Sequence, residues 1–287
     1  MRDIKNKIRK RIYEQHWTLG FIEGSLYDII KGNNHDIHYL KGMPRDRWFA
    51  DPFILDHDSE NIIVLVEEYS YKIRRGRIAR LIIDRNSYRL LAYKIILDLP
   101  THLSFPFIMR KNNKVYVLPE NSASGCWSIY NYDEHSSSLN SGKILLEEPL
   151  TDAILTKLMG EERVFTTQVP SPNGNRLQVY SLDGNLIETQ LFPSNIARNA
   201  GDWFSVGEQL FRPAQDCNGC YGKAVIIQEV VKAQDDSLTF KDICRIESTH
   251  PSYTTGCHTF NHYKDLSVID VHGYRWPTII KIISSFK

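Results

Sequence analysis

The 287-residue chain lacks an excess of charge of either sign. It has 35 Lys and Arg residues against 34 Asp and Glu residues, which leaves a formal net charge of +1. Proteins that bind duplex nucleic acid need a strong positive field, so we expect no nucleic-acid partner. Hydrophobic residues make up 42% of the chain and aromatic residues 11%, which excludes intrinsic disorder and indicates a folded globular protein.

Long hydrophobic runs are also missing. The longest apolar stretches, such as Thr278–Ile283, contain a lysine and are far shorter than a membrane-spanning helix of about 20 residues. The first 13 residues are basic, but they contain neither the apolar core nor the small-residue cleavage site of a secretion signal. We therefore expect a cytoplasmic protein. The basic segment leaves two interpretations open, a solvated terminus or a weak peripheral contact with the anionic inner membrane.

Cysteine is scarce, and the usual metal and cofactor motifs are absent from the sequence. An odd number of five cysteines without a secretion signal indicates reduced thiols. Cys217 and Cys220 form a single CxxC motif, whereas a zinc site would need a second pair at matching spacing. The histidines form no HExxH motif, and neither a glycine-rich dinucleotide loop nor a Walker A loop occurs. We expect no metal and no cofactor.

What the chain does contain is a series of short β-strand patterns. Runs of β-branched and aromatic residues, such as Asn61–Glu67 and Lys114–Leu118, alternate with polar turn clusters. A longer amphipathic helical pattern occurs only at Asp3–Tyr13. Many short strands separated by turns predict a sandwich, a barrel or a propeller.

An internal repeat favours the propeller. Five hairpins share an opening strand, a polar turn, and a second strand that ends in acidic or amide residues. Their openings are Trp48–Ile54, Ser104–Ile108, Asp152–Leu155, Arg198–Phe204 and Gly256–Phe260. A spacing of about 45 to 55 residues between openings is typical of propeller blades. We therefore predict an all-β protein with a single five-bladed β-propeller over residues 17–287, preceded by a short basic helical extension over residues 1–16.

The last predicted blade runs out of chain before its strands are complete. We expect an N-terminal strand around Trp17–Ile22 to supply the missing strand, which would leave no open sheet edge.

The hairpin geometry predicts a polar funnel at one rim of the propeller. In an antiparallel hairpin the start of the first strand and the end of the second lie at the same end. Such a rim offers the hydrogen-bond partners and aromatic faces that sugars need, so we expect a glycan or sugar-nucleotide ligand. The candidate binding residues are Glu68, His102, Ser104, Arg198, Arg212, Gln215, Tyr221 and His258.

For two of these candidates, Glu68 and Arg212, the sequence leaves a second interpretation open. Glu67 and Glu68 are neighbours on a strand and face opposite ways, so at most one of them reaches the funnel, and we favour Glu68. Arg212 could clamp a phosphate or carboxylate of the ligand, or it could form an internal ion pair with Asp216.

The chain resembles a known family in several short motifs. These are Phe49–Phe53, Leu65–Glu68, His102–Phe107, Pro119–Ser122, Arg212–Asp216 and Tyr221–Gly222. Together they are similar to the N-terminal domain of glucosamine inositolphosphorylceramide transferase, over about residues 15–275. The resemblance implies a five-bladed propeller related to arabinanase, levansucrase and invertase enzymes. It also implies a bacterial stand-alone form that belongs to surface-polysaccharide gene clusters, with a formyltransferase or a glycosyltransferase as partner.

The resemblance further implies roles for funnel carboxylates. Enzymes of the wider superfamily use a base or nucleophile in the first blade, a carboxylate that tunes pKa in the middle blade, and an acid. Asp51 matches the first position and Asp152 the second. The fourth blade opens with Asn199–Asp202, without the glutamate of these hydrolases, so Glu120 and Asp216 are the candidate acids.

Two functions stay open at this point. The first is an enzyme that cleaves or transfers a glycosyl unit during the synthesis of a bacterial surface polysaccharide, an O-antigen or capsule. The second is a non-catalytic module that binds a sugar or sugar nucleotide and serves a formyltransferase or glycosyltransferase.

Overall fold

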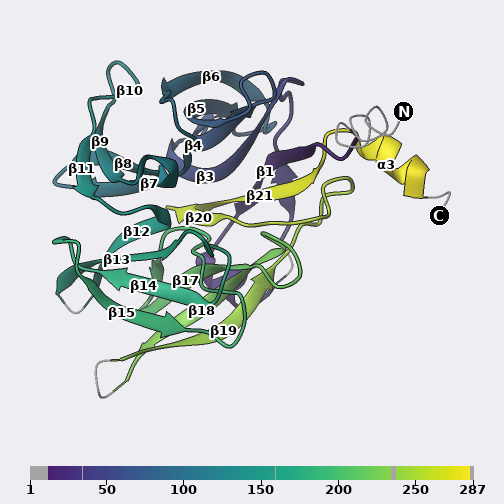
Figure 1. The fold of residues 1–287 in the computed structure, drawn as a ribbon. Coiled ribbons are helices and arrows are strands. Elements are labelled where there is room, and N and C mark those ends of the chain that lie inside the picture. The colour runs from purple at the N-terminus through teal and green to yellow at the C-terminus, as the bar shows by residue number, and fades with distance from the viewer. Residues whose placement is uncertain (1–11, 34, 159, 234–236, 285–287) are drawn as a thin grey trace, which may run out of the picture.

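The computed structural model describes residues 12–33, 35–158, 160–233 and 237–284. They form five antiparallel β-sheets arranged around a central axis (Figure 1). This confirms the predicted all-β, five-bladed propeller. The predicted helix at Asp3–Tyr13 lies outside the described residues except for its last two positions.

Four blades come from continuous segments, and their strands follow one another in sequence order, except that the last two strands of blade 2 both pair with the strand before them. Blade 1 consists of β3 (Arg47–His57), β4 (Asn61–Ser70), β5 (Gly76–Asp84) and β6 (Leu90–Leu97). Blade 2 consists of β7 (Ser104–Lys111), β8 (Lys114–Glu120), the short 3-10 helix η1 (Ser122–Ser124), β9 (Trp127–Asp133), β10 (Ser138–Leu139) and β11 (Lys143–Leu146). Blade 3 consists of β12 (Leu150–Leu158), β13 (Glu161–Gln168), β14 (Arg176–Tyr180) and β15 (Leu186–Leu191). Blade 4 consists of β16 (Phe204–Val206), β17 (Gln209–Asp216), β18 (Ala224–Lys232) and β19 (Leu238–Ile246).

Blade 5 joins the two ends of the chain. Its strands β20 (Phe260–Tyr263) and β21 (Leu266–Tyr274) come from the C-terminal part, and β1 (Gln15–Glu23) and β2 (Ile37–Tyr39) come from the N-terminal part. The pairing of β1 with β21 runs over the whole of both strands. The predicted closing strand is therefore present, but the N-terminal part supplies two strands and not one. With only three residues, β2 is too short to show a strand pattern in the sequence.

Two short helices flank blade 5. The helix α2 (Leu26–Ile30) connects β1 to β2, and the side chain of Ser25 caps it by accepting a hydrogen bond from the backbone of Tyr27. The helix α3 (Pro277–Ser284) follows β21 and points away from the propeller (Figure 1). In the described part of the chain, neither helix has the length and apolar character needed to cross a membrane.

The inner strands of blades 1, 2 and 3 bulge at the same place. The pairing register shifts between Ala50 and Phe53, between Ser104 and Phe107, and between Thr151 and Ile154. The first bulged residues are Asp51, Phe105 and Asp152, with φ angles of 50°, 40° and 44°. Few residues other than glycine adopt such angles, and bulges re-aim side chains next to functional sites. The fold thus places two aspartates at equivalent, strained positions.

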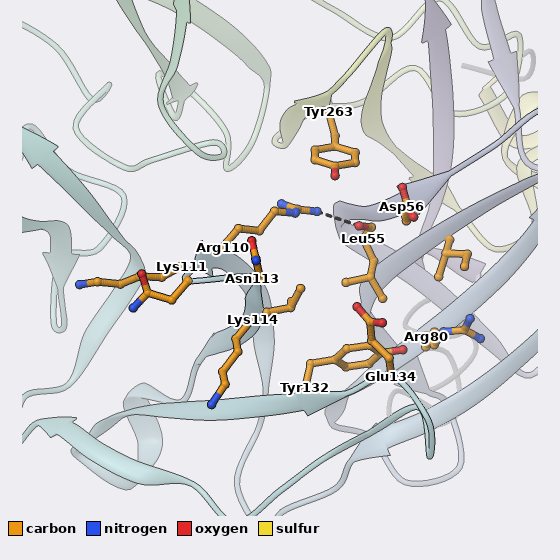
Figure 2. Close-up of a pocket in the computed structure, with 13 residues that line it drawn as sticks. Leu55, Asp56, Arg80, Arg110, Lys111, Asn113, Lys114, Tyr132, Glu134 and Tyr263 are labelled. Carbon is orange, nitrogen blue, oxygen red and sulfur yellow. Dashed lines mark hydrogen bonds between the residues drawn. The ribbon is translucent and has the colours of Figure 1, made fainter.

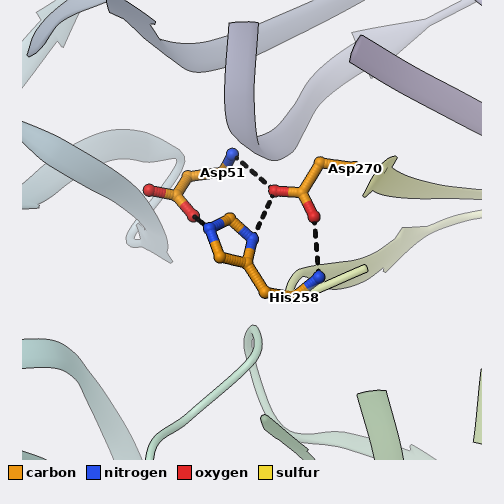
Figure 3. A group of neighbouring side chains, drawn as sticks. All are labelled: Asp51, His258 and Asp270. Carbon is orange, nitrogen blue, oxygen red and sulfur yellow. Dashed lines mark hydrogen bonds and ion pairs between the residues drawn. The ribbon is translucent and has the colours of Figure 1, made fainter. Parts of the chain in front are cut away.

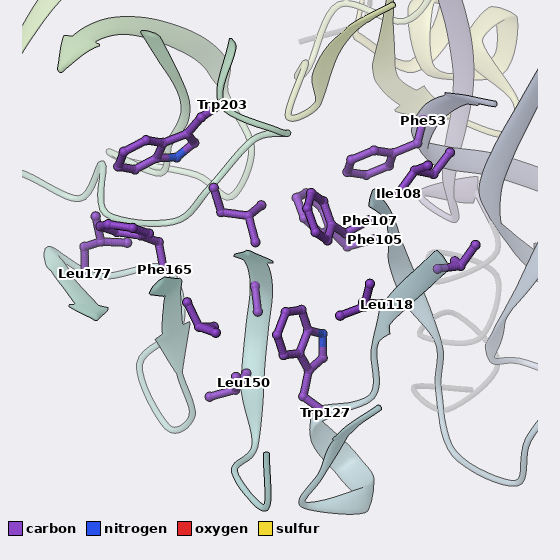
Figure 4. Close-up of a cluster of buried hydrophobic side chains, with 14 of the residues drawn as sticks. Phe53, Phe105, Phe107, Ile108, Leu118, Trp127, Leu150, Phe165, Leu177 and Trp203 are labelled. Atoms are coloured by element: carbon purple, nitrogen blue, oxygen red, sulfur yellow. The ribbon is translucent and has the colours of Figure 1, made fainter. Parts of the chain in front are cut away.

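Aromatic packing between the blades holds these bulges in place (Figure 4). Phe53 meets Phe105 edge to face, with ring centroids 5.0 Å apart, and Phe105 is fully buried. Further along the same cluster, Phe165 and Trp203 lie 4.4 Å apart and join blade 3 to blade 4. Because this packing is buried and dense, it fixes the strand ends on which the polar residues stand.

Candidate functional site

The hairpins have two ends, which we call the funnel rim and the turn rim. The funnel rim is the end of blade 2 at which Ser104 pairs with Glu120, and the turn rim is the end at which Lys111 pairs with Lys114. The polar residues of the funnel rim form two clusters. One lies between blades 5 and 1 and the other lies among blades 2, 3 and 4.

The first cluster is built around His258 (Figure 3). The imidazole Nδ1 lies 2.7 Å from Asp270 Oδ2, and Nε2 lies 3.7 Å from Asp51 Oδ1. The backbone N–H of Asp51 donates to the same Asp270 carboxylate at 2.9 Å. Trp17, from strand β1, stacks on the imidazole with a centroid distance of 4.0 Å. The ring is therefore held between two carboxylates and an indole.

The electrostatics of this cluster favour a protonated imidazole. Burial opposes the charge, but Asp270 and Asp51 outweigh it and raise the pKa of His258 to about 9. Burial also works against ionisation of Asp270, yet His258 and backbone N–H groups lower the pKa of that carboxyl. Burial raises the pKa of Asp51 to about 7, although His258 pulls it down. These shifts describe an imidazolium paired with the Asp270 carboxylate, beside an Asp51 carboxyl group with a pKa of about 7.

The same three residues could also be considered as metal ligands, since each offers one donor atom within 4.8 Å of the others. Their donors already have partners, however. Asp51 accepts from Thr259 Oγ1 at 3.0 Å and from the backbone N–H of Phe105 at 3.0 Å. In the described structure the donor atoms of this cluster are therefore engaged by protein partners.

The second cluster is built around Asp152. Arg198 Nε donates to its carboxylate at 2.6 Å, and Gln215 Nε2 donates to the same oxygen at 2.6 Å. Arg198 also lies 3.6 Å from Glu120 Oε2, and the backbone N–H of Asp152 donates to Glu120 at 3.0 Å. Burial, followed by the neighbouring Asp152, raises the pKa of Glu120 to about 8. Asp152 and Glu120 therefore share one guanidinium.

The opening segment of blade 4 places the Arg198 guanidinium beside Asp152, at the blade where the hydrolase pattern has a glutamate. The residues of its opening segment that reach Asp152 are Arg198 and Asn199, whose amide donates to the backbone oxygens of Asp152 and Phe165. No carboxylate of the described fourth-blade opening takes part in the cluster. Blade 4 therefore lacks the glutamate of the hydrolase pattern, and the charged group that it places beside Asp152 is positive and not negative.

Tyr221 and His102 form the accessible part of the funnel rim. Tyr221 is 40% exposed, with the Arg198 guanidinium 5.1 Å from its ring centroid and the His258 ring edge-on to it. The side chain of His102 is 46% exposed, and its Nε2 lies 3.2 Å from Glu67 Oε1. Gly222, with φ +59°, lets this loop approach closely, since a Cβ there would stand 2.7 Å from His258 Cβ. Ser104 is buried beside this surface, paired in register with Glu120.

The expectation for Glu68 was wrong in orientation. Glu68 is fully buried and accepts hydrogen bonds from Arg47 at 2.8 Å and Arg77 at 2.9 Å. It is Glu67 that faces the funnel and meets His102. The strand alternation was right, and the Arg47 and Arg77 guanidinium groups lie on the side of β4 to which Glu68 points.

Arg212 and Asp216 lie outside both clusters, and they do not pair with each other. Arg212 is fully buried and donates to Asn199 Oδ1, to Gln228 Oε1 and to the backbone oxygens of Ile196 and Ala197. Asp216 pairs with Arg245 at 2.7 Å. Burial opposes its ionisation, but Asn218 and Arg245 outweigh burial and lower the pKa of Asp216, whereas a general acid needs the reverse.

Two residues of the site were missed by the sequence reasoning, namely Trp17 and Thr259, whereas Glu67 was considered and Glu68 was preferred to it. The strand around Trp17 was expected, so its alternation pointed to Trp17 as one inward side chain. Thr259 lies in the blade 5 opening beside His258, but nothing in the sequence distinguishes its hydroxyl. Of the aromatic residues near the funnel, Phe49 and Phe105 are fully buried in the core.

Comparison with known proteins places these features in a family context. A family described as "Glucosamine inositolphosphorylceramide transferase 1, N-terminal" matches residues 40–280. Glucosamine inositolphosphorylceramide transferase 1 of Oryza sativa subsp. japonica is 26% identical over 205 residues, which cover 67% of this chain and 27% of the rice protein. The Arabidopsis thaliana protein of the same name is 26% identical over 151 residues, or 47% of this chain and 19% of that protein. The chain thus spans about a quarter of the length of these relatives or less.

Solved structures also resemble the propeller. A GH43 β-1,3-galactosidase with galactodeoxynojirimycin has a TM-score of 0.48 at 10% identity, covering 74% of this chain and 83% of that chain. A GH43_1 enzyme from Xanthomonas citri complexed with xylotriose has a TM-score of 0.47 at 10% identity, covering 80% of this chain and 88% of that chain.

Proposed function

Because the chain belongs to the glucosamine inositolphosphorylceramide transferase 1 N-terminal family, we propose that its funnel rim binds a sugar or a sugar nucleotide without cleaving it. The observation that carries this proposal is the position of Arg198. Its guanidinium neutralises Asp152 at 2.6 Å and lies 3.6 Å from Glu120, in the blade where a glycosidase would need a carboxylic acid.

Asp51 and Asp152 are buried and hydrogen-bonded to protein groups, which suits a binding site better than a hydrolytic site. Glycoside hydrolysis needs one free carboxylate and one carboxylic acid on either side of the scissile bond. Asp51 and Asp152 are only 4% and 1% exposed, and both oxygens of each accept hydrogen bonds from protein groups. The accessible groups are instead Tyr221 and His102. An aromatic face beside polar donors and acceptors is what a sugar ring needs.

Calorimetric titration with a panel of monosaccharides and sugar nucleotides tests this proposal. We expect saturable binding of at least one panel member, reduced about tenfold or more in Tyr221→Ala because the aromatic face is lost. Tyr27→Ala is the matched control, since Tyr27 is a 52% exposed tyrosine on helix α2. Absence of binding to every panel member, or equal affinity of Tyr221→Ala and wild type, would contradict the proposal.

A second candidate function is glycosyl cleavage or transfer, which the raised pKa values favour. Glu120, with a pKa of about 8, would be protonated at neutral pH and could donate to a leaving group, and Asp51 would act as base or nucleophile. Mass-spectrometric turnover assays on oligosaccharides and sugar nucleotides distinguish the two functions. A product formed by wild type and lost in both Asp51→Asn and Glu120→Gln would establish the enzyme and overturn the binding-only proposal.

We further propose that the chain acts in the assembly of a bacterial surface polysaccharide in the cytoplasm, beside a formyltransferase or glycosyltransferase. This setting is supported by the motif resemblance alone. Co-purification with such an enzyme from the same gene cluster tests it. Membrane contact through residues 1–16 stays a prediction, because most of that segment lies outside the described residues, and flotation with anionic vesicles tests it.

A further inference from the structure

A cavity of about 580 Å³ lies at the turn rim, between blades 1 and 2 (Figure 2). Its wall includes Arg80, Arg110, Lys114, Tyr132 and Tyr263. The volume falls within the range of small-molecule sites, which is about 300 to 1,000 Å³. Nothing in the proposed function uses this cavity.

The cavity is separate from the funnel rim. The turn between β7 and β8 contributes Asn112 and Asn113 to the cavity wall, whereas Ser104 and Glu120 at the other end of the same hairpin belong to the funnel rim. The hairpin spans seven residue steps from Ser104 to Lys111, or about 23 Å at 3.3 Å per residue. A ligand of monosaccharide size in one site does not reach the other.

The charges of the cavity wall do not cancel. Two of its charged residues have partners outside the wall, since Lys111 pairs with Glu162 at 2.5 Å and Asp56 pairs with Lys264 at 2.8 Å. The remaining charged residues of the wall, Arg80, Arg110, Lys114 and Glu134, form no ion pair among the described residues. Three cations of the wall therefore stand against one carboxylate, and of the three it is Arg110 on which the carboxylates of Asp202 and Asp56 also act.

The surroundings of Arg110 and Arg80 in the cavity wall favour the binding of an anion. Arg110 lies over the Tyr263 ring at 4.0 Å and donates through Nη2 to the backbone oxygens of Ile54 and Leu55. The guanidinium is thereby fixed. Burial lowers its pKa, and Tyr263, Asp202 and Asp56 oppose that lowering. Arg80 Nε is buried and has no hydrogen-bond partner in the described structure. A buried donor without an acceptor is costly, and an anionic ligand would satisfy it.

We propose that this turn-rim cavity binds a sugar-sized anion, a sugar that carries a phosphate or a carboxylate group. Arg80, Arg110 and Lys114 face the charged group, and the rings of Tyr132 and Tyr263 provide apolar surface for the remainder of the ligand. Phosphate and carboxylate share the geometry that a guanidinium fork recognises.

Calorimetric titration with glucose 1-phosphate, glucuronate and glucose tests this proposal. We expect saturable binding of at least one of the two anions and no measurable binding of glucose at this site. Arg80→Gln weakens anion binding about tenfold, because a charge-assisted hydrogen bond is lost. Lys114→Gln weakens it less, because Lys114 lies in the exposed turn. Salt weakens it as well, since exposed charges are screened.

Matched variants separate this site from the funnel rim. Arg176→Gln removes an exposed arginine from β14 in blade 3 and leaves anion binding unchanged. Tyr221→Ala also leaves it unchanged, so a failure of the proposed sugar site and a failure of this one are distinguishable. Thermal unfolding followed by circular dichroism verifies that each variant is folded. The proposal is wrong if neither anion binds, if Arg80→Gln and Arg176→Gln behave alike, or if Tyr221→Ala abolishes anion binding.

Discussion

The funnel rim and the turn rim differ in how their charges are held. At the funnel rim, Asp51, Asp152 and Asp270 are at most 4% exposed, and each binds a side chain or backbone group of another blade. At the turn rim, Arg80 and Lys114 line an open cavity without an ion pair among the described residues. Buried charges are costly unless they are compensated, so the funnel charges join blades to one another, whereas the turn-rim cations stay available to a ligand.

The funnel contacts join the blades into a ring. At each junction one polar group donates to an acceptor of the neighbouring blade. The donor and acceptor pairs are Asp51 N–H to Asp270, Phe105 N–H to Asp51, Asp152 N–H to Glu120, Asn199 amide to Asp152 O, and Asp202 N–H to Asn261. The ring of polar contacts thus closes through all five blades, in addition to the closure of blade 5 by β1. Carboxylates that resemble catalytic groups in the sequence also have this structural task.

We expect the largest difference in the free energy of unfolding when an arginine is replaced by methionine at each of the two rims. Arg198→Met removes the cation that neutralises the buried Asp152, and it should lower the free energy of unfolding by about 3 to 5 kcal/mol. Arg80→Met removes an arginine without an ion pair and should change that free energy by less than about 1 kcal/mol. Urea unfolding of both variants at neutral pH measures the difference. Equal losses would show that the two rims do not differ in charge compensation.

The pH dependence of the free energy of unfolding tests whether His258 at the funnel rim is held as an imidazolium. Its pKa in the folded protein is about 9, above the ordinary value of 6.5, so the folded state binds this proton more tightly. The resulting stabilisation is fully present below pH 6.5 and is lost as the pH rises through 9. Asp270→Asn should therefore cost about 2 to 3 kcal/mol at pH 6 and clearly less at pH 9.5. Urea unfolding at both pH values checks this, and a loss that does not depend on pH would argue against an imidazolium.

The repeat of the hairpins was sufficient to predict the propeller, its blade order and the end at which polar residues gather. These features depend on strand periodicity and spacing, which a single sequence carries. Asp51, Asp152, Glu120, Arg198, Gln215, Tyr221 and His258 were predicted at the funnel rim and do meet there.

What the sequence could not reveal is the direction in which individual side chains point. Glu67 and not Glu68 faces inward, because Arg47 and Arg77 hold Glu68 on the other face of β4. Arg212 was a candidate ligand-binding arginine in the sequence, yet its guanidinium is buried beside the Phe192 and Phe240 rings. Its burial depends on packing across blades, which no local pattern encodes.

A smaller effect is expected at Thr259, whose hydroxyl donates to Asp51 Oδ1 at 3.0 Å. Thr259→Val keeps the shape and removes this hydrogen bond from a buried carboxylate, so the free energy of unfolding should fall by about 1 to 2 kcal/mol. Thr189→Val on the outer strand β15 is the matched control, with no side-chain hydrogen bond to lose in the described structure. Equal unfolding midpoints in urea for the two variants would indicate that the Asp51 carboxylate does not depend on this donor.

The smallest effect on stability belongs to the turn rim, where Lys114 is exposed beside the Asn112–Asn113 turn. Lys114→Gln removes a solvated charge, and the free energy of unfolding should change by less than about 0.5 kcal/mol. The same substitution should nevertheless weaken anion binding in the turn-rim cavity. Urea unfolding and calorimetry on one preparation of the variant measure both quantities. A large loss of stability would mean that the turn-rim cations, like those of the funnel rim, hold the blades together, and the contrast between the two rims would disappear.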